Sequence, residues 1–138
     1  MTAFRYMLDT NAISEMVRNP DGTLADRVKA APTDALCTSA IVVSELRYGL
    51  RKRGAVSLAR RVEAVLGEIA ILPYDTPVSF AYAQTRDALE RRGQPIGYTD
   101  LFIAAHALSL ELTLVTANIR EFSRVEGLKV ENWLEAGP

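Results

Sequence analysis

Short apolar segments alternate with longer helix-like stretches over the whole chain, and this alternation limits the fold more than any other feature of the sequence. Strands that are separated by helices favour a parallel sheet with helices on both faces. We therefore predict a three-layer α/β/α sandwich with a mostly parallel central sheet. The expected strands are Phe4–Leu8, Ala35–Thr38, Glu68–Leu72, Leu112–Val115 and Gly127–Val130. The expected helices are one that begins after Asp9, Thr10 or Asn11 and runs to Val17, then Leu24–Ala30, Ala40–Arg53, Val56–Gly67, Val78–Arg92 and Leu101–Leu110.

Three helix starts carry expected capping residues. Ser39 is expected to cap the helix that starts at Ala40, and Asp75 or Thr76 to cap the one that starts at Val78. Asp100 is expected to open the apolar helix that follows it, where an acidic residue gains from the helix dipole.

The composition is that of a single globular domain, which we expect to span residues 1–138. Lys and Arg number 16 and Asp and Glu number 17, so the net charge of −1 excludes a strongly basic nucleic-acid-binding protein. Cys37 is the single cysteine and cannot form an internal disulfide. The first residues hold no apolar segment long enough for a signal peptide or a membrane span, so we expect a cytoplasmic protein without membrane contact.

The residue inventory removes several kinds of catalytic site. His106 is the single histidine, which excludes sites of two or three histidines and acid–base catalysis by a histidine pair. The sequence has no G-x-S-x-G motif for a serine hydrolase. Gly49–Gly54 has the glycine spacing of a phosphate-binding loop, but Ala55 and Val56 stand where Lys and Ser or Thr are required. Carboxylates, amides and hydroxyls remain as the candidate groups for a catalytic or binding site.

Three acids, Asp9, Glu45 and Asp100, border the expected core on separate elements. Each has an ordinary explanation, since Asp9 and Asp100 suit helix caps and Glu45 suits a salt bridge, but capping does not explain all three together. Ligands of parallel sheets bind beyond the carboxyl ends of the strands, where these side chains would meet. At about 4 Å each pair would repel by roughly 4 kcal/mol at an effective dielectric of 20. An all-oxygen cluster of this kind selects Mg²⁺ or Mn²⁺.

The chain resembles the PIN domain, and in particular the VapC-type toxin ribonucleases of type II toxin-antitoxin systems. The resemblance rests on an ordered set of segments that spans nearly the whole chain: Leu8–Asn11, Ser44–Gly49, Gly97–Asp100, Ile103–Ala107, Thr116–Asn118 and Glu121–Phe122.

This resemblance implies a Mg²⁺- or Mn²⁺-dependent endoribonuclease that hydrolyses RNA, such as transfer RNA, by metal-activated water. The products would carry 5′-phosphate and 3′-hydroxyl ends. It also implies inhibition by a cognate VapB-type antitoxin and a homodimer. Asp9, Glu45 and Asp100 match the acidic catalytic and metal-binding positions, whereas Asn118 stands where many PIN domains have a fourth acid and would act through a water. Thr116 is a candidate for positioning a water or a phosphate, although a plain strand-end hydroxyl is an equal alternative.

Two rival functions remain open at this stage. A haloacid-dehalogenase-like phosphohydrolase also places an aspartate after its first strand, but it requires a second acid where this chain has Asn11. A non-catalytic interaction or RNA-binding module would keep the acids only as caps.

Cations for RNA binding gather after Glu45. Arg47, Arg51, Lys52 and Arg53, followed by Arg60 and Arg61, place six of the 16 cationic residues within fifteen positions, although such a run also suits a solvated helix face.

The remaining aromatic and titratable residues have simpler expected roles. Tyr48 and Tyr98 neighbour the acids and could stack on bases, although packing is the commoner fate of tyrosine. His106 is expected to be a packed helix histidine, Trp133 a packing anchor and Cys37 an inert buried thiol.

Overall fold

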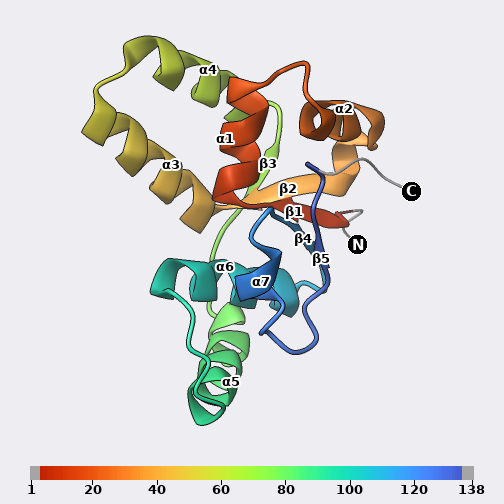
Figure 1. The fold of residues 1–138 in the computed structure, drawn as a ribbon, viewed down its shortest axis with the longest axis vertical. Helices are drawn as coiled ribbons and strands as arrows, with labels where there is room; N and C mark the ends of the chain where they lie inside the picture. The colour runs from red at the N-terminus through yellow and green to blue at the C-terminus, as the bar shows by residue number, and fades with distance from the viewer. Residues whose placement is uncertain (1–3, 135–138) are drawn as a thin grey trace.

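A computed structural model describes residues 4–134, and its centre is a five-stranded sheet in which every neighbouring pair of strands is parallel. The strand order is β3-β2-β1-β4-β5, so the first strand lies in the middle (Figure 1). The register places Leu8 opposite Thr38 on one side and Val115 on the other. The strands are β1 (Tyr6–Leu8), β2 (Leu36–Ser39), β3 (Ala70–Leu72), β4 (Thr113–Val115) and β5 (Val130–Glu131).

Helices cover both faces of the sheet, which confirms the three-layer prediction (Figure 1). The chain steps from β1 to β2 to β3 through the helices of one face, then crosses to β4 and β5 through those of the other, as right-handed crossovers require. The first face carries α1 (Thr10–Arg18), α2 (Thr23–Ala30), α3 (Ala40–Arg53) and α4 (Val56–Leu66), and the second carries α5 (Val78–Arg91), α6 (Tyr98–Ser109) and α7 (Ile119–Phe122).

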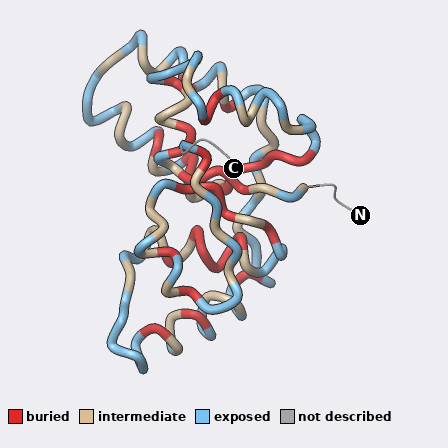
Figure 2. Tube along the Cα trace, turned by 45° about the vertical axis from the view of Figure 1, so that its right-hand side comes forward, coloured by how far each residue is buried: buried red, intermediate tan, exposed pale blue. Residues whose placement is uncertain are grey.

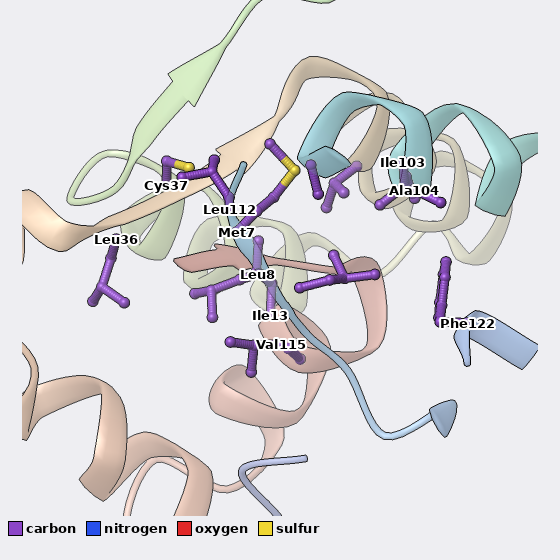
Figure 3. Close-up of a cluster of buried hydrophobic side chains, with 14 of the residues drawn as sticks. Met7, Leu8, Ile13, Leu36, Cys37, Ile103, Ala104, Leu112, Val115 and Phe122 are labelled. Carbon is purple, nitrogen blue, oxygen red and sulfur yellow. The ribbon is translucent and has the colours of Figure 1, made fainter. Parts of the chain in front are cut away.

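The hydrophobic core lies on both sides of the sheet. Buried chain segments gather in the middle of the molecule (Figure 2). Met7 lies toward Ile103 of α6, whereas the next residue, Leu8, lies with Val115 toward Ile13 of α1 (Figure 3). Successive strand residues point to opposite faces, so a strand with helices on both sides must be apolar throughout. This explains why the short strands show no polar alternation in the sequence.

Most element boundaries agree with the sequence predictions to within two residues; β1 and β3 begin two residues later than predicted, at Tyr6 and Ala70, and the larger differences occur at helix starts and at the C-terminal end. The α3 helix spans the predicted residues, and Ser39 caps it by accepting a hydrogen bond from the Ile41 N–H at 3.0 Å. The expected cap at Asp75 or Thr76 is wrong, because Pro77 precedes α5 and makes no side-chain cap.

The C-terminal third also departs from the predicted elements. The expectation that Asp100 opens the sixth helix is wrong, since that helix begins at Tyr98 after Gly97, with Asp100 in its first turn. The last strand is Val130–Glu131 rather than Gly127–Val130. A one-turn helix, α7, and a short 3₁₀ helix, Thr33–Ala35, are present without having been predicted.

The strand order places the topological switch point of the sheet between β1 and β4, at the edge where the strands end. The chain leaves β1 toward α1 on one face and leaves β4 toward α7 on the other, and these strands are neighbours. Loops that diverge from adjacent parallel strands open the space in which such sheets bind ligands. Asp9 directly follows β1 and Thr116 directly follows β4, so both lie at this position.

Candidate active site

Asp9 is a buried carboxylate that is held in place by backbone donors. Its side chain is 4% exposed and accepts a hydrogen bond from the Ala12 N–H at 2.8 Å, which makes it the N-cap of α1. Burial raises the pKa of Asp9, while the Thr116 hydroxyl and the N–H groups of Ala12 and Asn11 lower it in part. The capping role expected as an ordinary explanation is therefore real, and it coexists with a position inside the acid cluster.

Asp100 is the residue at which the acidic side chains meet. Its pKa is raised from 3.8 to about 7, first by burial, then by the charge of Glu121 and a hydrogen bond with it, and then by the charges of Asp9 and Glu45. Asp100 is thus affected by the carboxylates of three other residues, which lie between β1 and α1, on α3 and on α7. The structure brings together the three acids predicted from the sequence.

Glu121 is the fourth acid of this cluster, and the sequence reasoning did not include it among the site residues. Burial alone would raise its pKa, but hydrogen bonds from the Asn118 amide, the Gly97 N–H and Asp100, with the charge of Arg124, lower it. The Asn118 Nδ2 and Gly97 N atoms lie 2.9 and 3.1 Å from its two carboxylate oxygens. A protonated Asp100 that donates to ionised Glu121 accounts for the opposite directions of the two pKa changes.

The missing signal was the helical spacing between Asn118 and Glu121. Position 118, where many PIN domains have an acid, is an asparagine in this chain. The helix α7 begins directly after Asn118, and one helical turn places the side chain of Glu121 on the same side as that of Asn118. Because α7 is only one turn long, its periodicity is invisible in the sequence. The pair Glu121–Phe122 supported the resemblance without a chemical role being given to the glutamate.

Thr116 and Asn118 connect the end of β4 to the acids. The Thr116 side chain is 1% exposed, lies against Asp9, and accepts a hydrogen bond from the Asn118 N–H at 3.0 Å. Asn118 directs its amide NH₂ toward Glu121. Both polar residues therefore hold acidic side chains in place.

Glu45 lies in the middle of α3, half-buried, at the end of a groove between α1, α3 and α4. The groove has a volume of about 260 Å³ and includes Asn11, Arg18 and Arg53 among its lining residues. The predicted position beside the apolar arc is confirmed, since Val42 and Leu46 of the same helix are buried.

The start of α3 is fixed by a buried hydrogen-bond chain. Ser39 and His106 are 0% and 1% exposed, and the Ser39 Oγ lies 2.8 Å from His106 Nδ1. The imidazole also has a hydrogen bond with the Pro73 carbonyl, which can only accept, so one ring nitrogen donates to Pro73 and the other accepts from Ser39. Burial lowers the pKa of His106, which favours this neutral form. The prediction of a packed histidine is confirmed, and the contact ties α6 to α3.

The donor chemistry of the cluster suits a hard divalent cation, although its side chains are not arranged around one. Burial raises the pKa of Asp100 most, and the charges of Glu121, Asp9 and Glu45 raise it further, which is the part that a bound cation would relieve. Within residues 4–134, no group of three or more His, Cys, Asp or Glu side chains is positioned to hold a metal ion. The acids therefore fit the ion by their type and location, and ligation would require side-chain rotation.

The cationic residues after Glu45 divide into two sets. The Arg47 Nε and Nη2 atoms lie 3.1 and 3.0 Å from the carboxylate oxygens of Glu63 on α4, so this guanidinium joins α3 to α4. Arg51, Lys52 and Arg53 are exposed in the last turn of α3. A role of these four residues in RNA binding stays a prediction.

The comparison with protein families decides the family. The model of the PIN domain matches residues 6–128. The chain belongs to the PIN-domain family. "Ribonuclease VapC2" of Rickettsia felis is 35% identical over 130 residues, which are 93% of this chain and 97% of that protein. "tRNA(fMet)-specific endonuclease VapC" of Salmonella typhimurium is 37% identical over 134 residues, 94% of this chain and 98% of that protein. The resemblance to the VapC ribonucleases is thus confirmed.

Solved structures place this PIN domain in the same group. The VapBC2 structure from Rickettsia felis, bound to a DNA fragment from its promoter, matches with a TM-score of 0.86 and 31% identity over 94% of this chain and 99% of that chain. The DNA-bound VapBC structure from Salmonella typhimurium matches with a TM-score of 0.86 and 35% identity over 94% of this chain and 98% of that chain. The predicted fold class is confirmed by these matches. In the described part of this PIN domain, no helix is long and apolar enough to cross a membrane.

Proposed function

We propose that this PIN domain is a Mg²⁺- or Mn²⁺-dependent endoribonuclease and the toxin of a VapBC-type pair. The observation that carries the proposal is that Asp9, Glu45 and Glu121, from three separate parts of the chain, all lie near enough to Asp100 for their charges to raise its pKa. A helix cap explains the position of Asp9 but not the positions of the other three acids. Salt bridges do not explain them either, because none of the ion pairs found among residues 4–134 includes Glu45, Asp100 or Glu121. A cluster that costs folding energy is expected where function requires it.

The four acids would hold the ion, and the surrounding donors would keep them oriented. When bound, the divalent ion supplies Lewis-acid stabilisation of the phosphate and a nucleophile at neutral pH. The Ala12 N–H and the Thr116 hydroxyl fix the direction of the Asp9 carboxylate, and both lower its pKa in part against the effect of burial. Asp100 would release the proton that it shares with Glu121 when a cation replaces it.

The substrate is proposed to be RNA, with transfer RNA as the first candidate. The Salmonella relative carries the name of a tRNA(fMet)-specific endonuclease, and its similarity extends over nearly the whole of both chains. The exposed cations Arg51, Lys52 and Arg53 lie on the same helix as Glu45 and are proposed to contact the RNA backbone.

A VapB-type antitoxin is proposed as the inhibiting partner. The similar solved structures are named as VapBC assemblies, in which the chain like this one occurs together with a second protein. Such a module would act in the cytoplasm, and a homodimer of the toxin remains our expectation from the resemblance. Size-exclusion chromatography of the toxin with and without its antitoxin tests both assemblies.

The decisive experiment is cleavage of transfer RNA by the purified chain with Mn²⁺ or Mg²⁺, followed by end analysis of the products. We expect 5′-phosphate and 3′-hydroxyl ends and loss of cleavage in EDTA. Asp9→Asn and Glu121→Gln should abolish or strongly reduce cleavage, while Glu68→Gln, a matched change at an exposed acid on another part of the chain, should not. A 2′,3′-cyclic phosphate as the main product, or full activity in EDTA, would contradict the proposed chemistry. Binding of RNA without any cleavage would favour the non-catalytic module.

A further inference from the structure

A cavity next to the acid cluster has no role in the chemistry proposed above. It has a volume of about 250 Å³ and lies between α5 and the N-terminal turn of α6. Its apolar side is formed by Leu89, Ile96 and Leu101, of which Leu89 and Leu101 are 2% and 3% exposed. Its other side is formed by Tyr98, Arg86 and Glu90. We call this space the Tyr98 cavity.

Tyr98 presents an aromatic surface to solvent in a fixed orientation. Tyr98 is 65% exposed, so its ring is accessible to a ligand. The guanidinium carbon of Arg86 lies 5.1 Å from the centre of the ring. Arg86 is itself held by Glu90 at 3.0 Å and by the Tyr82 hydroxyl at 3.1 Å. The ring and the cation therefore form a preorganised platform on α5 and α6.

The Tyr98 cavity and the acid cluster share a residue. Gly97 lines the cavity, and its N–H donates to Glu121 at 3.1 Å. A Cβ atom at Gly97 would lie 3.9 Å from the Asp100 Oδ2 atom. A phosphate at the acids would therefore bring its neighbouring nucleotides to the edge of the cavity.

The chemistry of the cavity suits a flat ring with hydrogen-bond acceptors at its edge. A guanidinium has five N–H donors. Among the described residues, Arg86 gives one to Glu90 and one to Tyr82, which leaves three without a partner in that part of the chain. Aromatic faces bind every RNA base by stacking, and a neighbouring arginine strengthens the contact.

We propose that the Tyr98 cavity binds one unpaired base of the RNA, stacked on Tyr98, next to the bond that is cut. This inference rests on the proposed function in that the ligand is RNA. The base must be unpaired because a base inside a duplex has both faces covered by its neighbours. Tyr98 is thus a binding residue for the substrate and takes no part in the reaction at phosphorus.

The experiment measures binding rather than cleavage, so that it is independent of the metal. The full chain is titrated in EDTA against a fluorescent unpaired RNA oligomer and against a series in which single nucleotides are replaced in turn by an abasic one. Tyr98→Leu should weaken binding of the intact RNA by about 5- to 150-fold, the effect of about 1 to 3 kcal/mol for one stacked base. Tyr98→Phe, which keeps the ring, should bind within a factor of about two of the original chain.

The proposal requires coupling between Tyr98 and one base. With the RNA that is abasic at one particular position, the affinity of the original chain should fall by the same factor. With that RNA, Tyr98→Leu should not lower the affinity any further. The proposal would be overturned if Tyr98→Leu weakened binding equally at every abasic position. It would also be overturned if Tyr98→Leu bound the intact RNA as tightly as the original chain does, which is the result expected if a polypeptide covers the cavity instead. The abasic series with the original chain is informative even if the leucine variant does not fold. RNA that binds with this pattern but is never cleaved would contradict the nuclease proposal while supporting the base site.

Discussion

Asp100→Asn should make the protein more stable when divalent ions are absent. The change removes one charge from the cluster of four acids and keeps the shape of the side chain and an N–H donor toward Glu121. The pKa of Asp100 rises from 3.8 to about 7 on folding, because of burial and the neighbouring carboxylates. Each pKa unit corresponds to about 1.4 kcal/mol, so full ionisation costs the folded protein at most about 4 kcal/mol. Because Asp100 is only half-buried, solvent screening reduces this cost, and Glu121 recovers a further part of it, so we expect a gain of about 1 to 2 kcal/mol at pH 8.

The sign of the pH dependence follows from the same pKa change. Between about pH 4 and pH 7 the folded protein keeps the Asp100 proton that the unfolded chain releases. The free energy of unfolding of the original chain should therefore fall as the pH rises through this window and level off above it. Below about pH 4 both states are protonated and the advantage of Asp100→Asn should disappear.

Urea unfolding followed by circular dichroism in EDTA, at pH 4, 6 and 8, measures this difference. Glu68→Gln, at an exposed position, controls for the loss of one negative charge and should leave the slope with pH unchanged. Added Mn²⁺ should then stabilise the original chain more than the variant. If Asp100→Asn is no more stable than the original chain at pH 8, the carboxylates do not repel one another as inferred here.

Three further changes test other parts of the structure. Ser39→Ala should lower the free energy of unfolding by about 2 to 4 kcal/mol, measured by thermal unfolding, because it removes a helix cap and leaves buried His106 without its partner. Arg51→Ala together with Arg53→Ala should reduce the slope of log affinity for RNA against log salt, and an unchanged slope would exclude these residues as phosphate contacts. Cys37 should react with a thiol reagent at pH 8 only after unfolding, since burial raises its pKa to about 12 and covers the sulfur.

Most of the fold could be predicted because most of its elements have a local signal. The helix Ala40–Arg53 has a serine cap, a continuous apolar arc and a glycine after its last turn, and the structure reproduces these limits. The helix after Gly97 lacked such a signal, because Gly97 caps it without a side chain and Asp100 is an attractive but incorrect alternative. The helices α4 and α5 also lack a side-chain cap but begin at Val56 and Val78, as predicted, so the start of α6 was missed because Asp100 offered a false cap and not only because the true one is backbone.

The acid cluster was partly predictable for a similar reason. Asp9, Glu45 and Asp100 follow or border elements that the sequence already placed, so a parallel sheet was enough to bring them together. Glu121 belongs to a helix of one turn, and its role depends on hydrogen bonds with Gly97 and Asn118 that form only in the folded chain. The Arg47–Glu63 pair shows the same limit, because sixteen residues separate partners that helix packing makes adjacent.

The central place of β1 in the sheet has a consequence for how this PIN domain is assembled during synthesis. Residues 6–8 lie between β2 and β4, and the latter strand is synthesised more than one hundred residues later. Asp9 is therefore synthesised long before Asp100 and Glu121, the acids with which it forms the cluster. A product that ends before β4 lacks a neighbour for β1 on that side of the sheet and lacks Glu121, so the proposed site can assemble only after β4 and α7 have been synthesised.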